Sequence, residues 1–423
     1  MTTLWPTNPR VTSILAGSLT MLVSYFLARK LFGRQVGLVT LALVTLSPWT
    51  VMLSRLALEA NLAVLFISLG MLCLVSKKHL WSIIFFGISV WTYNSARIFV
   101  PLFMFSYWLI YRFKLDKKTL IIGGLLFLPM IYQLLNSTGQ ARYSKLSLID
   151  DGAIGKINKL QTTQWGGRMV YNKATYFAAA FAKNYVSYLS PNFLFTKGGD
   201  HYQFSVQNYG LLYLICLPFF YIGLIKIFNN KLLILWFLLA PVAGSITRDS
   251  PHTLRAITML PLPMMLTALG VVSILKKYYL AILPIFILFS INYQLASNSY
   301  LLNYSWSWQY GYKEVVQIIK QDYDKYDQIV FSKKYGEPHE FVAFYWPWDP
   351  ADFAKNKAWD YHDNWYWVNE LGKIKFVNDW EMKSYVYKPK TLIISSSENI
   401  PAGTEIKRIN SLDGKPAFII KEL

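Results

Sequence analysis

Acidic residues are scarce over most of this 423-residue chain: only six of its 23 Asp and Glu residues precede position 298. Cysteine is scarcer still, and the two residues present, Cys73 and Cys216, both lie in apolar runs. This usage excludes a disulfide framework and favours small core residues over thiol chemistry. The sequence also lacks a His-Glu-x-x-His motif and paired cysteines, so we expect no metal site and no cofactor.

Long apolar runs, by contrast, are abundant. The chain is 54% hydrophobic and 17% aromatic but only 15% charged, with a mean hydropathy of +0.29. Runs of about 17–22 apolar residues recur, each long enough to cross a hydrocarbon core of roughly 30 Å. We therefore predict an α-helical polytopic membrane protein. The ten predicted spans lie near residues 11–28, 36–53, 60–76, 80–95, 98–113, 119–135, 209–228, 231–246, 254–275 and 278–297.

The net charge of +19 is unevenly distributed. Residues 1–297 carry 26 of the 42 Lys and Arg residues, whereas residues 298–423 are nearly neutral. The excess lies mostly in short loops, as the orientation of membrane helices by positive charge requires. We therefore exclude nucleic acid as a partner. We predict a transmembrane module over 1–297 and an extracytoplasmic α/β domain over 298–423.

Alternate loops between the predicted spans differ in charge. Five of them hold 13 basic residues against one acid, Asp116, so we assign these loops to the cytoplasmic side of the plasma (inner) membrane. Their basic residues are Arg29, Lys30, Arg34, Lys77, Lys78, Arg112, Lys114, Lys117, Lys118, Lys226, Lys231, Lys276 and Lys277. The connections 54–59, 94–97, 136–208 and 247–253 then face outward.

The outward connections hold basic residues where orientation by positive charge disfavours them. Arg55, Arg97, Arg248 and Arg255 lie there, with His252 beside them. A charge at the middle of a span costs roughly 2.5–3.5 kcal/mol, so charges near spans usually have a reason. Long basic side chains also extend from helix ends to the interface without any function, which is the alternative for each arginine alone. Their common location favours an anionic ligand.

The stretch “TYNSARIFVP” forms a polar interruption between two predicted spans. Tyr93 and Asn94 accompany Arg97 in it. We expect a tight outward connection over 94–97. Pro101 would then lie in the first turn of the following span, where proline removes no internal hydrogen bond.

Several motifs follow one another in a typical order. They are an Arg-x-x-Ser-x-Leu-x-Gly-x-Leu run from Arg10, then “ARKLFGR”, “LSPW”, “SRLALEAN”, “YNSARIFVPL”, “YLSPNFLF” and “APVAGSITRDSPHTLRAI”. With these motifs, the chain resembles the bacterial branch of the GT-C-fold glycosyltransferases that use polyprenyl-phosphate sugars, over roughly residues 10–345. That superfamily includes the protein O-mannosyltransferases of glycosyltransferase family 39 and the aminoarabinose transferase of lipid A.

The resemblance implies transfer of a sugar from a polyprenyl-phosphate carrier to a protein, lipid or glycan hydroxyl on the extracytoplasmic side of the membrane. Such a reaction needs a carboxylate to accept the proton of the hydroxyl, and cations to stabilise the departing phosphate. Arginine suits the second role because its planar guanidinium binds phosphate oxygens in pairs. The implied donor-binding residues are Arg55, Tyr93, Asn94, Arg97, Arg248, His252 and Arg255.

The resemblance also implies a general base that accepts the proton of the acceptor hydroxyl. In the resembling enzymes it is an acidic residue in the first outward loop, and this sequence begins at the far end of that loop. We expect a misassigned or truncated start, with weak or no activity; a degenerate protein and a substitute base are the alternatives. Glu59, four residues after Arg55 on the outward end of a helix, is the first candidate for a substitute. Asp249 is the second, and an intrahelical pair with Arg55 is the alternative role of Glu59.

Two other classes of function remain open. One is a transporter or flippase for a lipid-linked saccharide, and the other is a binder of the carrier lipid without catalysis. Transporters usually show repeated halves and polar residues at mid-span. The sequence has no convincing internal repeat, and its ionisable residues lie at the outward ends of the spans, which favours the transferase.

The regions outside the predicted spans also have local patterns. Residues 136–208 are expected to form short helices along the membrane interface. In the α/β domain, residues 310–323 have helical spacing, whereas “QIVFS”, “TLIISS” and “AFIIKEL” indicate buried strands. Six tryptophans between 346 and 380 are interpreted as core plus an interfacial belt, with a sugar-stacking surface as the alternative.

Overall fold

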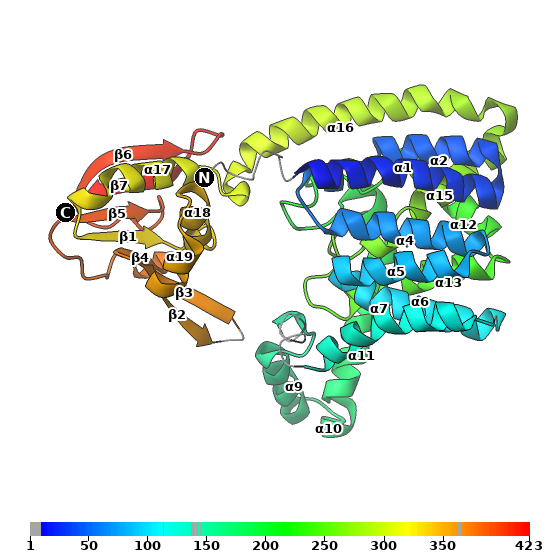
Figure 1. Ribbon diagram of the computed structural model, residues 1–423, viewed down its shortest axis with the longest axis horizontal. Coiled ribbons are helices and arrows are strands. Elements are labelled where there is room, and N and C mark those ends of the chain that lie inside the picture. The colour runs from blue at the N-terminus through cyan, green and yellow to red at the C-terminus, as the bar shows by residue number, and fades with distance from the viewer. Residues whose placement is uncertain (1–9, 113, 137–139, 141–142, 144, 363–364) are drawn as a thin grey trace. The chain divides into compact units, whose positions relative to one another are not determined.

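The computed structural model describes residues 10–112, 114–136, 140, 143, 145–362 and 365–423. The stretch before Arg10, the last residue of the predicted span 98–113 and parts of the predicted outward segment lie outside the described residues. The chain forms two compact units, Met1–Gln294 and Leu295–Leu423, which we call the helical unit and the sheet unit (Figure 1). The predicted class, a helical protein with apolar helices and a C-terminal sheet domain, is confirmed.

The helical unit consists of helices with mostly short connections (Figure 1). Its α-helices are α1 (Arg10–Phe32), α2 (Arg34–Leu46), α3 (Pro48–Arg55), α4 (Ala60–Val75), α5 (His79–Thr92), α6 (Asn94–Tyr111), α7 (Lys117–Leu135), α9 (Asp151–Thr163), α10 (Gly167–Val170), α11 (Lys173–Leu189), α12 (Leu217–Lys226), α13 (Lys231–Leu239), α14 (Val242–Ser245), α15 (Leu262–Leu275) and the first part of α16 (Leu283–Asn303). Shorter segments are η1 (Asn192–Thr196), η2 (Leu214–Cys216), η3 (Ile257–Met259) and η4 (Lys276–Ile282).

Not every apolar helix is long enough to cross a membrane alone. Among the described residues, three helical runs are long and apolar enough: Arg10–Phe32, Lys117–Leu135 and Leu262–Asn303. Helices α2 and α3, bent by 52° at their junction, make a fourth if they count as one span. Shorter apolar helices of 10–17 residues account for several of the other predicted spans. The number of ten spans therefore stays a prediction.

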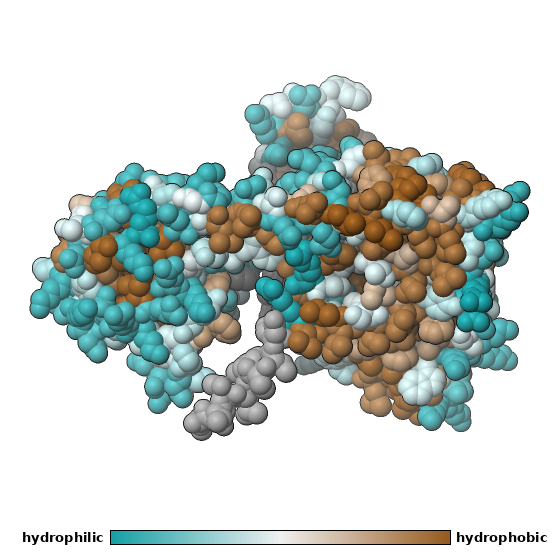
Figure 2. Space-filling view, turned by 90° about the horizontal axis from the view of Figure 1, so that it is seen from above, coloured by the Kyte–Doolittle hydropathy of each residue, from teal (hydrophilic) through white to brown (hydrophobic). Residues whose placement is uncertain are grey.

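Helix α1 packs mainly through small residues. Its buried stripe consists mainly of small or weakly polar residues, among them Ser13, Ala16, Gly17, Thr20, Ser24 and Ala28. Several of its large apolar residues, including Leu15, Leu19, Leu22 and Phe26, are exposed, whereas Val23 and Leu27 are buried. Small residues let helix backbones approach closely where the surrounding solvent is as apolar as the side chains. Figure 2 accordingly shows hydrophobic residues over much of the viewed surface of this unit.

Helices α12 and α15 approach each other most closely at two glycines. A Cβ atom on Gly223 would lie 1.9 Å from the carbonyl oxygen of Leu266, and one on Gly270 would lie 1.9 Å from that of Phe219. Both contacts are far shorter than any real Cβ contact, so only glycine fits at either position. The two helices therefore pack backbone against backbone.

The structure corrects several predicted boundaries. The expected connection 94–97 is wrong, because a single residue, Tyr93, in extended conformation separates α5 from α6, which already begins at Asn94. Pro101 consequently lies inside α6 and not in its first turn. The spans expected from 209 and from 254 begin as α-helices only at Leu217 and Leu262, where a proline occupies the first turn and helps to start the helix.

The sheet unit contains a seven-stranded sheet of order β2-β3-β4-β1-β5-β7-β6. Its strands are β1 (Gln328–Ser332), β2 (Lys357–His362), β3 (Trp365–Leu371), β4 (Ile374–Val377), β5 (Thr391–Ser395), β6 (Thr404–Asn410) and β7 (Pro416–Glu422). Strand β1 pairs in parallel with β4 and β5, and the other neighbours pair antiparallel. The three strands indicated by the sequence are β1, β5 and β7.

Helices cover this sheet and close its core. They are α17 (Tyr312–Asp322), α18 (Pro338–Tyr345) and α19 (Pro350–Asn356). The unit also contains the last part of α16 and the short segments η5 (Ser305–Trp308), η6 (Tyr323–Lys325) and η7 (Asp379–Glu381). Val315 and Ile319 of α17 pack with Ile329 and Phe331 of β1 in one apolar cluster. Every residue of β1 and β5 is buried, as expected for central parallel strands covered on both faces.

The tryptophans of the sheet unit divide between core and surface. Trp346 and Trp348 pack against the core, whereas Trp359 and Trp380 are 47% and 73% exposed. The first pair agrees with the predicted core role. The exposed pair leaves both the interfacial belt and sugar stacking open.

Candidate functional site

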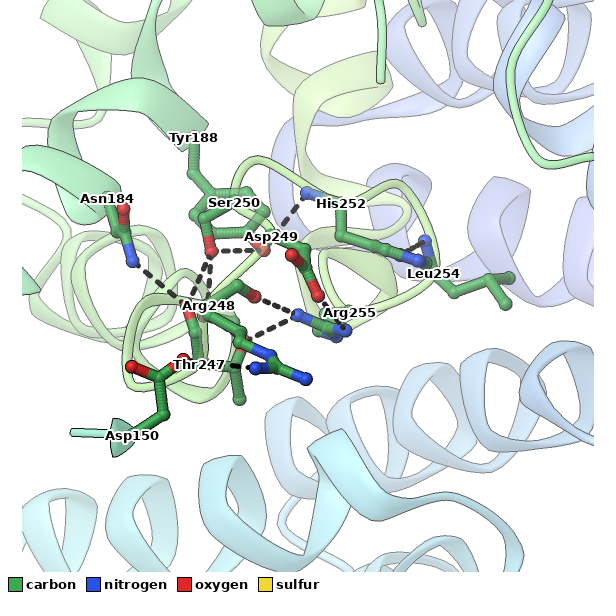
Figure 3. Close-up of polar contacts among 11 residues, drawn as sticks. Asp150, Asn184, Tyr188, Thr247, Arg248, Asp249, Ser250, His252, Leu254 and Arg255 are labelled. Carbon is green, nitrogen blue, oxygen red and sulfur yellow. Dashed lines mark hydrogen bonds and ion pairs between the residues drawn. The ribbon is translucent and has the colours of Figure 1, made fainter. Parts of the chain in front are cut away.

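The loop 247–255, which precedes η3 and α15, carries four of the predicted site residues (Figure 3). Helix α11 fixes its start, because the side-chain amide of Asn184 donates to the carbonyl oxygens of Ser245 at 3.3 Å and Thr247 at 3.0 Å. The hydroxyl of Ser250 closes the turn by donating to the carbonyl oxygens of Gly244 and Thr247, both at 3.1 Å. The loop is therefore held by specific hydrogen bonds on both of its flanks.

Tyr188 of α11 is the buried centre of these contacts. Its hydroxyl accepts a hydrogen bond from the backbone N–H of His252 at 3.1 Å and lies 3.4 Å from the Ser250 hydroxyl. Position 244 must be glycine, because a Cβ there would lie 2.4 Å from the tyrosine oxygen. Burial raises the pKa of Tyr188. The phenol therefore stays protonated, and its hydroxyl positions the loop through its contacts with His252 and Ser250.

Arg255 is the least exposed cation of the loop, with 13% of its side chain accessible. One guanidinium nitrogen, Nη1, donates to the hydroxyl of Thr247 at 2.8 Å and to the carbonyl oxygen of Arg248. The other, Nη2, lies 3.8 Å from a carboxylate oxygen of Asp249, whose side chain is 64% exposed. Figure 3 shows the two side chains turned toward each other. A fixed guanidinium thus stands next to an accessible carboxylate.

Arg248 points away from this pair toward Asp150 (Figure 3). Its guanidinium lies 3.1 Å from the carboxylate, and its backbone N–H donates to the carbonyl oxygen of Leu146. Asp150 also caps α9 by accepting from the N–H of Ala153 at 2.8 Å. That bond and the Arg248 guanidinium lower the pKa of Asp150. Because both side chains are about half exposed, the pair contributes little stability and mainly tethers the loop.

The start of α6 is the second component of the site. Tyr93 precedes the helix and makes no side-chain cap, so the N–H groups of the first turn keep the partial positive charge of a helix N-terminus. Arg97 lies in this first turn, with its Nε donating to the carbonyl oxygen of Val90 at 3.3 Å. A full and a partial positive charge therefore coincide here.

A cavity of about 120 Å³ joins the two components. Its lining residues are Tyr93, Asn94, Ser95, Arg97, Ile98, Leu134, Tyr143, Leu146, Ala243, Ile246, Thr247 and Arg255. Two arginines and the N-terminus of α6 thus share one hollow with a largely apolar wall. No carboxylate is among these lining residues, so the excess charge of the cavity is positive. Such a surrounding suits a phosphate attached to an apolar chain.

The structure brings together only part of the predicted set. Tyr93, Asn94, Arg97 and Arg255 line the cavity, and Asp249 contacts Arg255. Arg248, Asp249 and His252 belong to the same loop as Arg255 but are not lining residues. The Nδ1 of His252 accepts from the backbone N–H of Leu254 at 3.2 Å, and its ring lies near those of His201 and Phe204.

The predicted placement of Glu59 and Arg55 on one helix is wrong. Helix α3 ends at Arg55, Leu56 is extended and α4 begins only at Ala60, so helical spacing does not relate the two residues. Arg55 instead donates to the side chain of Gln294 in α16 at 3.2 Å. Glu59 is exposed at the start of α4, without a capping hydrogen bond. Neither residue lines the cavity.

Sequence reasoning missed the residues that hold the loop. Tyr188 lies within the motif “YLSPNFLF”, which is the one signal that could have identified it. Asn184 and Thr247 carry no comparable signal, because their role depends on contacts between distant segments. Within the described part of the chain, no group of three His, Cys, Asp or Glu residues could hold a metal ion.

Comparison with known proteins places these observations in context. Residues 7–135 match the family model described as dolichyl-phosphate-mannose-protein mannosyltransferase, which confirms the resemblance over these residues. Curated proteins give no match. Apo ArnT from Cupriavidus metallidurans is similar at 11% identity, over 97% of this chain and 83% of that chain, with a TM-score of 0.47.

Two further solved structures are similar. ArnT from the same organism bound to undecaprenyl phosphate aligns at 9% identity over 97% of this chain and 83% of that chain, with a TM-score of 0.47. The oligosaccharyltransferase AglB from Archaeoglobus fulgidus, in complex with an inhibitory peptide and a dolichol-phosphate, aligns at 14% identity. That alignment covers 71% of this chain and 46% of AglB, with a TM-score of 0.38.

Proposed function

We propose that the chain is a membrane glycosyltransferase that takes a sugar from a polyprenyl phosphate and transfers it to an acceptor hydroxyl outside the cytoplasm. The observation that carries this proposal is the cavity in which Arg97, Arg255 and the N-terminus of α6 converge. The family match over residues 7–135, whose description names a dolichyl-phosphate sugar, supports the same class of donor. The acceptor is a hydroxyl on a protein, lipid or glycan.

The phosphate of the donor is bound by the two arginines. Arg255 is largely removed from water, which strengthens its interaction with an anion, and its position is fixed by Thr247. Arg97 approaches from α6 together with the N–H groups of that helix. The charge on the phosphate rises as the sugar leaves, so these groups stabilise the transition state more than the bound donor.

The carboxylate of Asp249 is the proposed general base. The oxygen of the acceptor hydroxyl attacks the anomeric carbon, the bond from that carbon to the phosphate oxygen breaks, and the hydroxyl proton passes to Asp249. The phosphate leaves as an anion, so no general acid is required. Asp249 is preferred to Glu59 because it contacts Arg255, whereas Glu59 lies on a different segment away from the cavity lining.

The cavity must widen to admit a donor. Its volume of about 120 Å³ is below the roughly 300–1,000 Å³ of typical ligand pockets. Tyr143 and Leu146 form part of its wall and precede α9 in the chain. We infer that donor binding displaces this segment, and that Arg248, which is paired with Asp150 at its end, follows the displacement.

Donor use by an Arg97→Lys variant tests the proposal. Lysine keeps the charge but loses the planar pair of N–H groups, so we expect donor binding to weaken about tenfold to a hundredfold. Arg112→Lys, at the exposed other end of α6, is the matched control. The measurement is transfer of labelled sugar from polyprenyl phosphate, with donor binding measured in parallel.

Each outcome of this experiment is informative. Loss in Arg97→Lys with an unchanged control supports the phosphate role. Full donor binding by Arg97→Lys would leave Arg97 as an interfacial cation. Donor binding that never leads to transfer, in wild-type protein supplied with protein, lipid and glycan acceptors, would favour a carrier-lipid binder over an enzyme. Movement of the intact donor across vesicles would favour a flippase.

A further inference from the structure

A second hollow, of about 480 Å³, lies where α1 and α4 end. Its lining residues are Phe26, Arg29, Lys30, Leu72, Cys73, Ser76 and Lys78, and we call it the basic groove. Helices α1 and α4 pack side by side and share an apolar cluster (Figure 1). Helix α5 leads from the groove to the cavity at the start of α6, a distance of about 21 Å at 1.5 Å per residue. The two sites are therefore separate.

Three cations converge on the groove, two from α1 and one from the turn between α4 and α5. Arg29 and Lys30 belong to the last turn of α1. Lys78 is turned back over the end of α4, because its N–H donates to the carbonyl oxygen of Cys73 at 2.8 Å. Lys77 makes this turn possible by adopting a positive φ of 60°, a conformation that favours glycine at this position of a helix end. Lys77 itself does not line the groove.

The charge of the groove is not balanced by its surroundings. No carboxylate is among the lining residues. The C-termini of α1 and α4 carry about half a negative charge each, against three full positive charges. A net charge of about two therefore remains for a ligand. Cations near loop ends also arise from helix orientation alone, but that rule places them in loops and does not require a shared hollow.

The part of the groove wall that precedes the cations along α1 and α4 is apolar. Phe26 is 49% exposed on the outer face of α1, and Leu72 and Cys73 continue the apolar surface on α4. The groove thus changes from apolar to cationic along the direction of the helices. Its volume falls within the roughly 300–1,000 Å³ of typical ligand pockets. An amphiphile with an anionic head and an acyl chain has the matching order of polarity.

We propose that the basic groove binds the headgroup of an anionic phospholipid. Arg29, Lys30 and Lys78 hold its phosphate, and Phe26 and Leu72 contact the beginning of an acyl chain. Basic pockets between membrane helices are suited to such headgroups. The shared chemistry is a phosphate anion, and the apolar wall favours a lipid over a soluble phosphate compound as its source.

Thermal unfolding of delipidated full-length protein in detergent tests the proposal. Phosphatidylglycerol is compared with phosphatidylcholine and with inorganic phosphate at equal ionic strength. The variant Arg29→Gln/Lys30→Gln/Lys78→Gln removes the cations of the groove. Its control, Arg34→Gln/Lys226→Gln/Lys231→Gln, removes the same charge from other helix ends but leaves the groove residues and the turn at Lys77 intact.

We expect phosphatidylglycerol to raise the unfolding temperature of the wild-type protein more than either comparison does. Each cation changes the affinity for the lipid roughly fivefold. The groove variant should therefore need on the order of a hundredfold more phosphatidylglycerol for the same rise in unfolding temperature. The control should stay within about threefold of wild type. An equal loss in the control, equal stabilisation by phosphatidylcholine, or equal stabilisation by inorganic phosphate would overturn the proposal.

A second variant covers the case in which the triple substitution prevents folding. Ser76→Phe fills the groove without changing any charge, and Ser76 follows the last residue of α4. It should lower the affinity for phosphatidylglycerol at least tenfold while leaving all three cations in place. Unchanged affinity in this variant would show that the charges act without the groove and would overturn the proposal.

Discussion

The helical unit and the sheet unit differ in what their elements expose. In the sheet unit the core consists of large apolar side chains, such as Ile319, Phe331 and Ile394, and β6 turns charged residues outward. The helical unit also buries large side chains, but its helix α1 buries mainly serine, threonine, alanine and glycine and exposes several leucines and a phenylalanine. Water drives the first arrangement through the hydrophobic effect, whereas helices in lipid associate by close backbone packing and hydrogen bonds.

The two units should therefore be sensitive to different substitutions. A residue that is too large should damage the helical unit most, because its helices approach backbone to backbone. A residue that is too small should cost stability where a large apolar side chain is buried, as in the core of the sheet unit, and little where such a side chain is exposed, as along α7. The predictions below test this contrast.

The largest expected effect is that of Gly270→Leu. Its side chain would begin 1.9 Å from the carbonyl oxygen of Phe219, so α12 and α15 cannot pack. We expect the folded protein to be lost, measured as the monodisperse fraction in size-exclusion chromatography. Gly124→Leu is the control, because a Cβ at Gly124 has its nearest neighbour at 3.6 Å. A normal elution profile for Gly270→Leu would contradict the close approach of the two helices.

A pair of truncations sharpens the contrast directly. Ile394→Ala removes a fully buried side chain from β5 and should cost about 3 kcal/mol of unfolding free energy. Leu128→Ala, at a position 65% exposed on α7, should change it by less than about 0.5 kcal/mol. The comparison uses denaturant unfolding with a probe in each unit. Equal costs would mean that the exposed apolar face of α7 is packed against protein.

A substitution at the buried carboxylate of Asp379 tests how much a buried hydrogen-bond network stabilises the sheet unit. Asp379 accepts hydrogen bonds from Ser332 at 2.6 Å, Ser396 at 2.9 Å and Asn399 at 2.7 Å. Asp379→Asn would turn one acceptor oxygen into an N–H donor that faces other donors. We therefore expect the free energy of unfolding to fall by about 2 kcal/mol. Asp413→Asn, in a turn between β6 and β7, is the matched control. Equal stability of the two variants would contradict the network.

The smallest expected effect concerns the ion pair of the loop. The lowered pKa of Asp150 means that its pairing stabilises the fold above its unfolded pKa of about 3.9, and that this stability is lost as pH falls through the lower folded value. Asparagine still caps a helix, so the variant Asp150→Asn removes the ion pair with Arg248 but keeps the cap of α9. The unfolding temperatures of variant and wild type should differ slightly at pH 7 and converge below about pH 4. Asp151→Asn should show no such convergence.

The sequence predicted those features that depend on local pattern. Strands β1, β5 and β7 are continuous apolar runs, and α17 has regular helical spacing, so their buried residues were recognisable. Strands β2 and β3 were missed, because their aromatic and charged residues lack a clear alternation. The start of α6 was predicted four residues too late, since Asn94 to Arg97 were interpreted as a loop although they form the first turn of the helix.

The candidate site was only partly predictable for a different reason. Residue type and predicted sidedness were sufficient to select Arg97 and Arg255, which line the cavity, as candidate anion ligands. Their meeting in one cavity depends on contacts between α6, α14 and the loop before α15, which no local pattern encodes. The same limitation explains why Arg55 was grouped with them although it contacts Gln294.

The two glycine contacts between α12 and α15 have a mechanical consequence for the site. Gly223 lies against Leu266 and Gly270 against Phe219, so each helix engages the other at two heights, one turn apart. Sliding one helix by a turn, about 5.4 Å, would break both engagements at once. The loop bearing Arg255 continues through η3 into α15, so a shift of α15 would act on it. The translational register of α12 and α15 thus bears on the position of this arginine at the cavity wall.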